Sequence, residues 1–255
     1  MTVKILRKIP FLLIPLISVF AVFADADVTV LCYHRIIPET QNLYDVSVLE
    51  FEKQIKTLID NGYKIIKIKD FLEGIDKKSL PEKACIITID DGDISSYENV
   101  YPIIKKYKIP VTFFIYTDYI SRGKRSVSWE KLGEMIKHKS SLVDIGSHTR
   151  THPYLTRLKV KGSKELDMGK IEKEIAESKK IIEDKLKISI KYFAYPYGLY
   201  NNDIERIVIR SGYEASFTLD WGNNDINTNK FRIKRKLVVS VTDSGKFISI
   251  IKMSK

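Results

Sequence analysis

The stretch that decides the fold is Ala-Cys-Ile-Ile-Thr-Ile-Asp-Asp-Gly, residues 84–92. Its apolar, β-branched beginning predicts a buried strand over 84–89. The strand delivers two adjacent carboxylates, Asp90 and Asp91, and Gly92 permits the chain to turn directly after them. Neighbouring strand residues point to opposite sides, so both carboxylates can serve one site only if the strand ends here. A surface turn or a helix N-cap is the alternative interpretation.

A second polar cluster, Ser-His-Thr-Arg-Thr-His-Pro, occupies residues 147–153 and holds two of the four histidines of the chain. Pro153 disfavours helical geometry at the residue before it, so His148 and His152 are expected in a loop or a single distorted turn. No glutamate follows His148, which excludes the His-Glu-x-x-His arrangement of zinc proteases. With the two carboxylates, the imidazoles can hold a divalent ion and leave one carboxylate as a general base. Two hydrogen-bonded histidines in a polar loop are the alternative.

Strand-like and helix-like segments alternate along the rest of the chain. Strands are expected at 28–33, 63–68, 84–89, 111–116, 142–145, 191–195, 213–218 and 236–240. Helices are expected from the Ser-Val-Leu-Glu capping box at 47–50 to Gly62, at 94–107, after Ser128, and at 163–186, 201–211 and 247–252. Repeated strand–helix units indicate a parallel sheet, and their number favours a single-domain α/β barrel. An open Rossmann sheet is the alternative, but no Gly-x-Gly-x-x-Gly follows the first strand. In a barrel, polar residues at the strand ends converge on one face.

The first 24 residues are predicted to be a secretory signal peptide. A basic start precedes an uncharged, mostly apolar run at 9–23, and Val-Phe-Ala before Asp25 is typical of a cleavage site. Residues 25–255 would then form the functional domain outside the cytoplasm. The run is short for a membrane span, although an uncleaved anchor is the alternative.

The net charge of +11 would fall to +8 on removal of the three cations in residues 1–24. The lysines are spread along the chain without an arginine-rich block, so we expect a solvated surface and no nucleic-acid partner. The charge could hold an exported protein near an anionic cell envelope. Cys32 and Cys85 lie in apolar strand-like runs and are expected to be free thiols, although an oxidising compartment would permit a disulfide.

Three motifs in order resemble those of the polysaccharide deacetylase family (the NodB-homology domain, carbohydrate esterase family 4). They are Thr-Ile-Asp-Asp-Gly at 88–92, His-Thr-Arg-Thr-His at 148–152 and Phe-Ala-Tyr-Pro-Tyr-Gly at 193–198. The resemblance covers about residues 28–240. It implies a distorted (β/α)7 barrel.

Two departures resemble one branch of the family, which de-N-acetylates poly-β-1,6-N-acetylglucosamine. Ala194 replaces an arginine that steadies the catalytic aspartate in the family, and no histidine follows His152 to supply the usual late acid. That branch carries a Tyr-His motif on its first strand, which Leu-Cys-Tyr-His-Arg-Ile at 31–36 matches. The resemblance therefore makes His34 the candidate acid. Arg235, in a Lys-Arg-Lys stretch that matches the branch only in part, is a candidate replacement for the missing arginine. A solvated basic strand edge is the alternative for Arg235.

The resemblance implies the roles of the site residues. Asp91, His148 and His152 would hold a divalent metal, with zinc first and cobalt, nickel or iron as alternatives. Asp90 would be the base and His34 the acid. Candidates for oxyanion or substrate binding are Tyr195, Pro196, the backbone N–H of Tyr197, Trp221 and Arg235, and Trp129 is a further aromatic that could stack on sugar.

The expected activity is removal of N-acetyl groups from an N-acetylglucosamine polymer, with release of acetate. Peptidoglycan, chitin-like oligosaccharide and acetylated xylan are alternative substrates. A catalytically weak carbohydrate-binding domain is the alternative from another class, because the usual arginine and late histidine are absent. The expected partner is the carbohydrate polymer, and nothing in the sequence indicates an obligate protein partner.

Overall fold

The computed structural model describes residues 27–137 and 142–252. The expected signal peptide, residues 1–24, lies outside the described residues. Within the described ranges, no helix combines the length and apolarity needed to cross a membrane.

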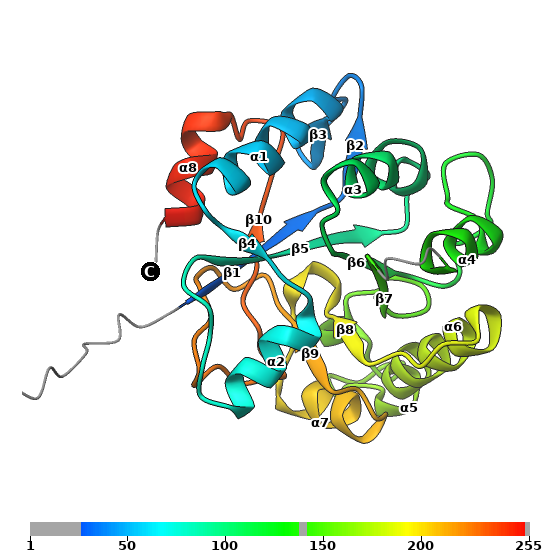
Figure 1. The fold of residues 1–255 in the computed structure, drawn as a ribbon. Coiled ribbons are helices and arrows are strands. Elements are labelled where there is room, and N and C mark those ends of the chain that lie inside the picture. Colours follow the sequence, from blue (N-terminus) through cyan, green and yellow to red (C-terminus); the bar gives the residue numbers. More distant parts are fainter. Residues whose placement is uncertain (1–26, 138–141, 253–255) are drawn as a thin grey trace, which may run out of the picture.

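A curled parallel sheet forms the centre of the molecule, with helices around it (Figure 1). The strands follow the order β10-β1-β5-β6-β7-β8-β9, and each pairing along this path is parallel. Their bounds are β1 Val28–Tyr33, β5 Ala84–Asp91, β6 Val111–Ile115, β7 Val143–Ser147, β8 Tyr192–Ala194, β9 Ala215–Phe217 and β10 Lys236–Leu237. Strand β4 (Lys64–Ile65) pairs with β5 beside this path, and β2 (Arg35–Ile37) and β3 (Asp45–Ser47) form a separate small sheet.

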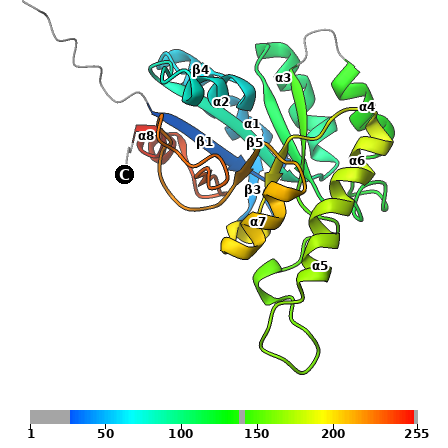
Figure 2. The same cartoon turned by 90° about the horizontal axis from the view of Figure 1, so that it is seen from below.

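The helices follow the strands in sequence. They are α1 Val48–Asp60, α2 Ile68–Asp76, α3 Tyr101–Tyr107, α4 Trp129–Lys137, α5 Met168–Glu172, α6 Ser178–Leu186, α7 Asn202–Arg210 and α8 Ser244–Lys252. A π-helical turn, Lys173–Glu177, joins α5 to α6. The segment before α5 extends away from the barrel (Figure 2), and its two arms pair through Lys159 and Leu166.

The segment from Ile233 to Lys236 closes the barrel. Ile233 forms a parallel bridge with Phe217 of β9, and Lys236 pairs with Leu31 of β1. The two edges of the sheet are therefore joined through this short segment. The seven strands along the path make the distorted (β/α)7 barrel of a single domain, as the sequence predicted.

Alternation along β5 separates two apolar clusters. Cys85, Ile87 and Ile89 belong to the large cluster between the sheet and the helices. Ala84 and Ile86 belong to a second cluster, whose members come from most strands of the sheet and therefore fill the barrel. Each fully buried isoleucine contributes about 1.5–3 kcal/mol relative to an exposed one. Because β5 buries apolar side chains both inside the barrel and against the helices, its even-numbered residues are held facing inward.

Helix α2 closes the end of the barrel where the strands begin. Its Phe71 and Ile75 pack in the same cluster as Val28 and Ala84, the first residues of β1 and β5. The opposite end, where the strands finish, is left for the site.

Several local predictions were wrong. The strand expected at 63–68 is only β4, because Ile68 starts the apolar i, i+3, i+4, i+7 pattern of α2. The helix expected from residue 163 begins at Met168, since Leu166 is held in the extended arm described above.

Other local predictions were confirmed. The Ser47 side chain caps α1 by accepting a hydrogen bond from the Glu50 N–H at 3.1 Å. Cys32 and Cys85 are both buried free thiols.

Candidate active site

The two adjacent aspartates reach the same space because the strand ends between them. Asp90 continues the inward-facing series of β5 and is 1% exposed. Asp91 adopts a left-handed backbone with φ of 77°, and Gly92 follows with φ of 83°. A Cβ on Gly92 would lie 2.6 Å from the Cδ1 atom of Ile120, so the buried Ile120 side chain would have to shift to admit it. The turn therefore needs this glycine and directs both carboxylates to one side.

The two histidines occupy a loop after β7, as expected from Pro153. The backbone N–H of His148 donates to the Ile115 carbonyl, which anchors the start of the loop on β6. The Nδ1 atom of His148 lies 2.8 Å from the Ala194 carbonyl oxygen, so it carries the proton that it donates. Its Nε2 atom is therefore free to act as a ligand. Burial lowers the pKa of His148 to about 4, which keeps the ring neutral.

Three donor atoms converge at the mouth of the barrel. The Nε2 atoms of His148 and His152 are 3.1 Å apart. The Oδ1 atom of Asp91 lies 3.9 Å from the first and 3.6 Å from the second. This oxygen is buried and has no hydrogen-bond partner among the described residues. Two imidazole nitrogens and an orphaned carboxylate oxygen, all within 4.8 Å of one another, fit a divalent cation.

Asp90 is held by a bidentate ion pair with Arg235. The two terminal guanidinium nitrogens donate to Oδ1 and Oδ2 at 2.7 and 2.8 Å. The Nε–H of Arg235 donates to the Thr218 carbonyl at 3.0 Å, and Nη1 lies 3.2 Å from the Thr88 hydroxyl. Arg235 is 1% exposed, so the guanidinium is not a solvated strand edge.

This pair sets the charge of Asp90. Burial has the largest single effect and would raise the pKa of the carboxyl group. The charge and hydrogen bonds of Arg235, together with the nearby His148 and His34, outweigh burial and hold the pKa well below its ordinary range. Asp90 is therefore ionised despite its acidic neighbour. Its Oδ2 atom lies 3.7 Å from the Nε2 atom of His148, directly beside the three-donor group.

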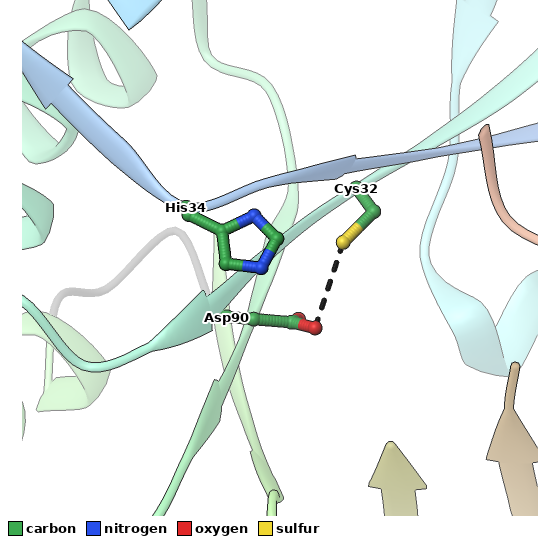
Figure 3. Close-up of side chains that lie close together, drawn as sticks. All are labelled: Cys32, His34 and Asp90. Carbon is green, nitrogen blue, oxygen red and sulfur yellow. Dashed lines mark hydrogen bonds between the residues drawn. The ribbon is translucent and has the colours of Figure 1, made fainter. Parts of the chain in front are cut away.

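His34 follows β1 and approaches Asp90 from the side away from β7. Figure 3 shows its ring facing the Asp90 carboxylate, with the Cys32 thiol beside both. One potential ligand atom from each of these three side chains lies within 4.8 Å of the others. The Nδ1 atom of His34 is buried without a hydrogen-bond partner among the described residues.

The Cys32 contact was missed by sequence reasoning. Its Sγ lies 3.5 Å from Oδ2 of Asp90, and burial raises the pKa of the thiol, so it is a neutral donor. A signal was available, because residues two apart on a strand share a face and Cys32 is two before His34.

A pocket of about 440 Å³ opens over these groups. Its lining includes His34, Asp90, Asp91, His148, His152, Tyr195, Tyr197 and Arg235, together with Arg35, Asn42 and Tyr44, which the sequence did not single out. The structure thus brings together eight of the ten site residues expected from the sequence.

Some of the residues expected to bind the oxyanion or the substrate line the pocket, and others do not. Tyr195 is buried and its hydroxyl accepts a hydrogen bond from Ser216 at 3.0 Å, whereas Tyr197 is exposed and has φ of 59°. Pro196 is buried but does not line the pocket. Trp221 also lies outside the lining, with its ring beside the Lys236 ammonium group.

Comparisons with known proteins agree with the motifs and the fold. A family profile described as polysaccharide deacetylase matches residues 77–216. Poly-beta-1,6-N-acetyl-D-glucosamine N-deacetylase from Staphylococcus aureus (strain MRSA252) is 34% identical over 199 residues, which cover 76% of this chain and 68% of that protein. The protein of the same name from Staphylococcus epidermidis is 31% identical over 201 residues, with the same coverage.

Two solved structures show the same fold. IcaB from Ammonifex degensii matches with a TM-score of 0.73 and 28% identity, covering 89% of this chain and 98% of that one. The Streptococcus pyogenes deacetylase PplD, solved in complex with acetate, matches with a TM-score of 0.78 and 22% identity, covering 90% and 100%. With the family profile matching more than half of its length, the chain belongs to the polysaccharide deacetylase family and is an enzyme of that class.

Proposed function

We propose that this chain is a metal-dependent N-deacetylase that acts outside the cytoplasm on poly-β-1,6-N-acetylglucosamine. The substrate is that named for the staphylococcal relatives. The observation that carries the proposal is the Arg235–Asp90 ion pair beside the group formed by Asp91, His148 and His152. An ionised, rigidly held carboxylate beside a group of candidate metal donors supports hydrolysis of an amide bond.

Asp91, His148 and His152 are the residues that would hold the metal. Zinc is our first choice, with cobalt, nickel or iron as alternatives, because two imidazoles and a carboxylate suit any of them. When bound, such an ion supplies Lewis acidity and lowers the pKa of water. The neutral state of His148 suits this role, since a protonated imidazole cannot be a ligand.

The protein's own groups supply the proton transfers. Asp90 takes a proton from the attacking water, and Arg235 keeps the carboxylate ionised and oriented for this task. The water oxygen adds to the acetamide carbonyl carbon, and the backbone N–H of Tyr197 is our candidate donor to the resulting oxyanion. His34 gives a proton to the nitrogen as the C–N bond breaks, which yields acetate and a free amine.

Two residues from elsewhere in the chain lie where the missing family arginine and late histidine would be needed. Arg235 contacts Asp90 where the family arginine is replaced by Ala194, and His34 lies near the same carboxylate where the late histidine is missing. These two contacts support the catalytic proposal over the binding-only one.

The test is acetate release from β-1,6- and β-1,4-linked N-acetylglucosamine oligomers, with chelator and with metal restored. We expect release from the β-1,6 series, loss with chelator and recovery with metal. Asp90→Asn should abolish release, while the control Asp203→Asn, on the exposed surface of α7, should not. Release from the β-1,4 series alone would redirect the proposal to chitin-like or peptidoglycan substrates. Release that persists in Asp90→Asn would overturn the assignment of the base.

Export through residues 1–24 is a separate part of the proposal. It rests on the sequence pattern, and the mass of the protein recovered from outside the cytoplasm tests it. A mature chain beginning at Asp25 is expected, and an intact chain in the soluble cytoplasmic fraction would refute export. Attachment to the anionic envelope through the basic surface would show as release by high salt.

A further inference from the structure

The rim of the pocket carries an exposed aromatic ring that the mechanism does not use. Tyr44 lines the pocket and is 51% exposed. Its ring centroid lies 5.5 Å from that of His34. Among the described residues its hydroxyl group has no hydrogen-bond partner, so both the outer surface of the ring and its polar tip are available.

The loop that presents Tyr44 is rigidly built. The buried carboxylate of Asp45 accepts from the Nε and Nη2 atoms of Arg35, both at 2.8 Å. It also accepts from the backbone N–H groups of Gln41 and Asn42 at 2.7 and 3.0 Å. Satisfying four donors with one buried carboxylate fixes the path of the loop.

Two further contacts fix the residues beside Tyr44. The Asn42 side chain accepts from the Tyr44 N–H at 2.9 Å, and the Leu43 carbonyl accepts from Ser240 at 2.8 Å. The tyrosine is therefore displayed on a preorganised support rather than on a free loop. Ordering costs for a ligand that contacts it are correspondingly small.

A second group of packed aromatic rings lies at the pocket beside His152. Tyr197 is 42% exposed and stacks on Tyr154 with ring centroids 3.7 Å apart and planes within 3°. The guanidinium of Arg157 covers the Tyr154 ring at 4.5 Å. The Tyr197 ring therefore packs against both Tyr154 and His152, whereas the ring contact that Tyr44 makes among the described residues is with His34. Tyr44 is the less enclosed of the two pocket tyrosines.

We propose that Tyr44 is the specificity-determining contact for the sugar unit next to the one that is deacetylated, with its ring packing against the apolar face of that sugar. The inference rests on the proposed function. Sugar rings present C–H groups on one face and hydroxyls at the edge, which suits a fixed tyrosine with an apolar body and a free polar tip. The pocket volume of about 440 Å³ is in the range of small-ligand sites, so a long polymer extends beyond the pocket and past the exposed ring of Tyr44.

The test compares kcat and KM for β-1,6-linked oligomers of two to five units. Wild type should gain in kcat/KM with length, and Tyr44→Ala should lose roughly three- to tenfold on the pentamer and less on the dimer. Tyr44→Phe should keep most of the gain, because the ring remains. The matched control is Leu43→Ala, a neighbour with the same 51% exposure that does not line the pocket, and it should behave as wild type.

A merely structural role gives a different pattern. If Tyr44 only steadied His34, Tyr44→Ala would lower kcat by the same factor at every length, and that result would overturn the proposal. Equal kinetics for Tyr44→Ala and wild type would overturn it as well.

Binding separates failure of this inference from failure of the proposed function. Calorimetry should compare pentamer binding to Asp90→Asn and to the double variant Asp90→Asn/Tyr44→Ala. The double variant should bind the pentamer roughly three- to tenfold more weakly, as in the kinetics. If wild type releases no acetate but this difference in binding is found, the activity is refuted and the sugar contact stands. If the pentamer binds equally with and without Tyr44→Ala, the sugar contact is refuted whatever the activity.

Discussion

Replacing Arg235 by methionine isolates the ion pair on which the proposed base depends. The substitution keeps an apolar stem of similar length but removes both short contacts to Asp90 and the bond to the Thr218 carbonyl. The carboxylate stays buried without its cation. Breaking a buried pair in this way costs about 3–5 kcal/mol, part of which is relieved when the carboxyl group takes up a proton.

The pH dependence gives the sign of the effect. In wild type the pKa of Asp90 is depressed in the folded state, so its contribution to stability is present above the ordinary carboxyl range and is lost only as pH falls through the depressed value. Without Arg235, burial dominates and raises the pKa. Protonation then begins at higher pH, and the acid limb of kcat/KM should move toward neutrality. Activity at neutral pH should fall by up to the roughly 10²–10⁴-fold that a general base supplies.

The assay combines urea unfolding with the pH profile of acetate release. Arg206→Met is the control, because Arg206 pairs with Asp203 at the surface and its loss should cost no more than about 1 kcal/mol. The double variant Arg235→Met/Asp90→Asn should recover part of the lost stability, since no unpaired charge remains. Equal stability losses for the two single arginine variants, with an unmoved acid limb, would refute the reasoning.

Three further predictions concern other parts of the site. His34→Ala should lower kcat by roughly 10²-fold or more with little change in KM, measured by acetate release, because it removes the proposed acid and not a binding contact; near-normal turnover would exclude His34. A chelator should lower the melting temperature, and added metal should restore it to a plateau, since the ion binds only the folded site. His148→Ala is the control, and its melting temperature should be the same with and without metal. Gly92→Ala should destabilise the fold by about 1–3 kcal/mol in urea unfolding, because the alanine would need φ of 83° and would meet Ile120; wild-type stability would contradict the strained-turn account.

The strands and the grouping of the candidate metal donors were predictable because their signals are local. The apolar run before Asp90 and the spacing of His148 and His152 are each contained within a few residues. A parallel barrel then brings such strand ends together whatever their separation in the chain. Helix α2 was not predicted although its apolar spacing is readable, because its first residue, Ile68, also fits the end of the apolar run expected as a strand over 63–68.

The second layer of the site was less predictable because its contacts are distant in sequence. Arg235 meets Asp90 across 145 positions, and only closure of the barrel by the segment from Ile233 to Lys236 explains that meeting. The sequence offered Arg235 only as a candidate. The rim residues Arg35 and Tyr44 could not be foreseen, since the loop that carries them is shaped by Asp45 rather than by a regular element.

The central claim is that Asp91, His148 and His152 bind one metal ion beside Asp90. Anomalous diffraction from crystals grown with zinc tests it directly. The account predicts one strong peak within bonding distance of all three side chains, with Asp90 still paired to Arg235. A peak at Cys32 and His34 instead, or no peak near His148, would contradict it.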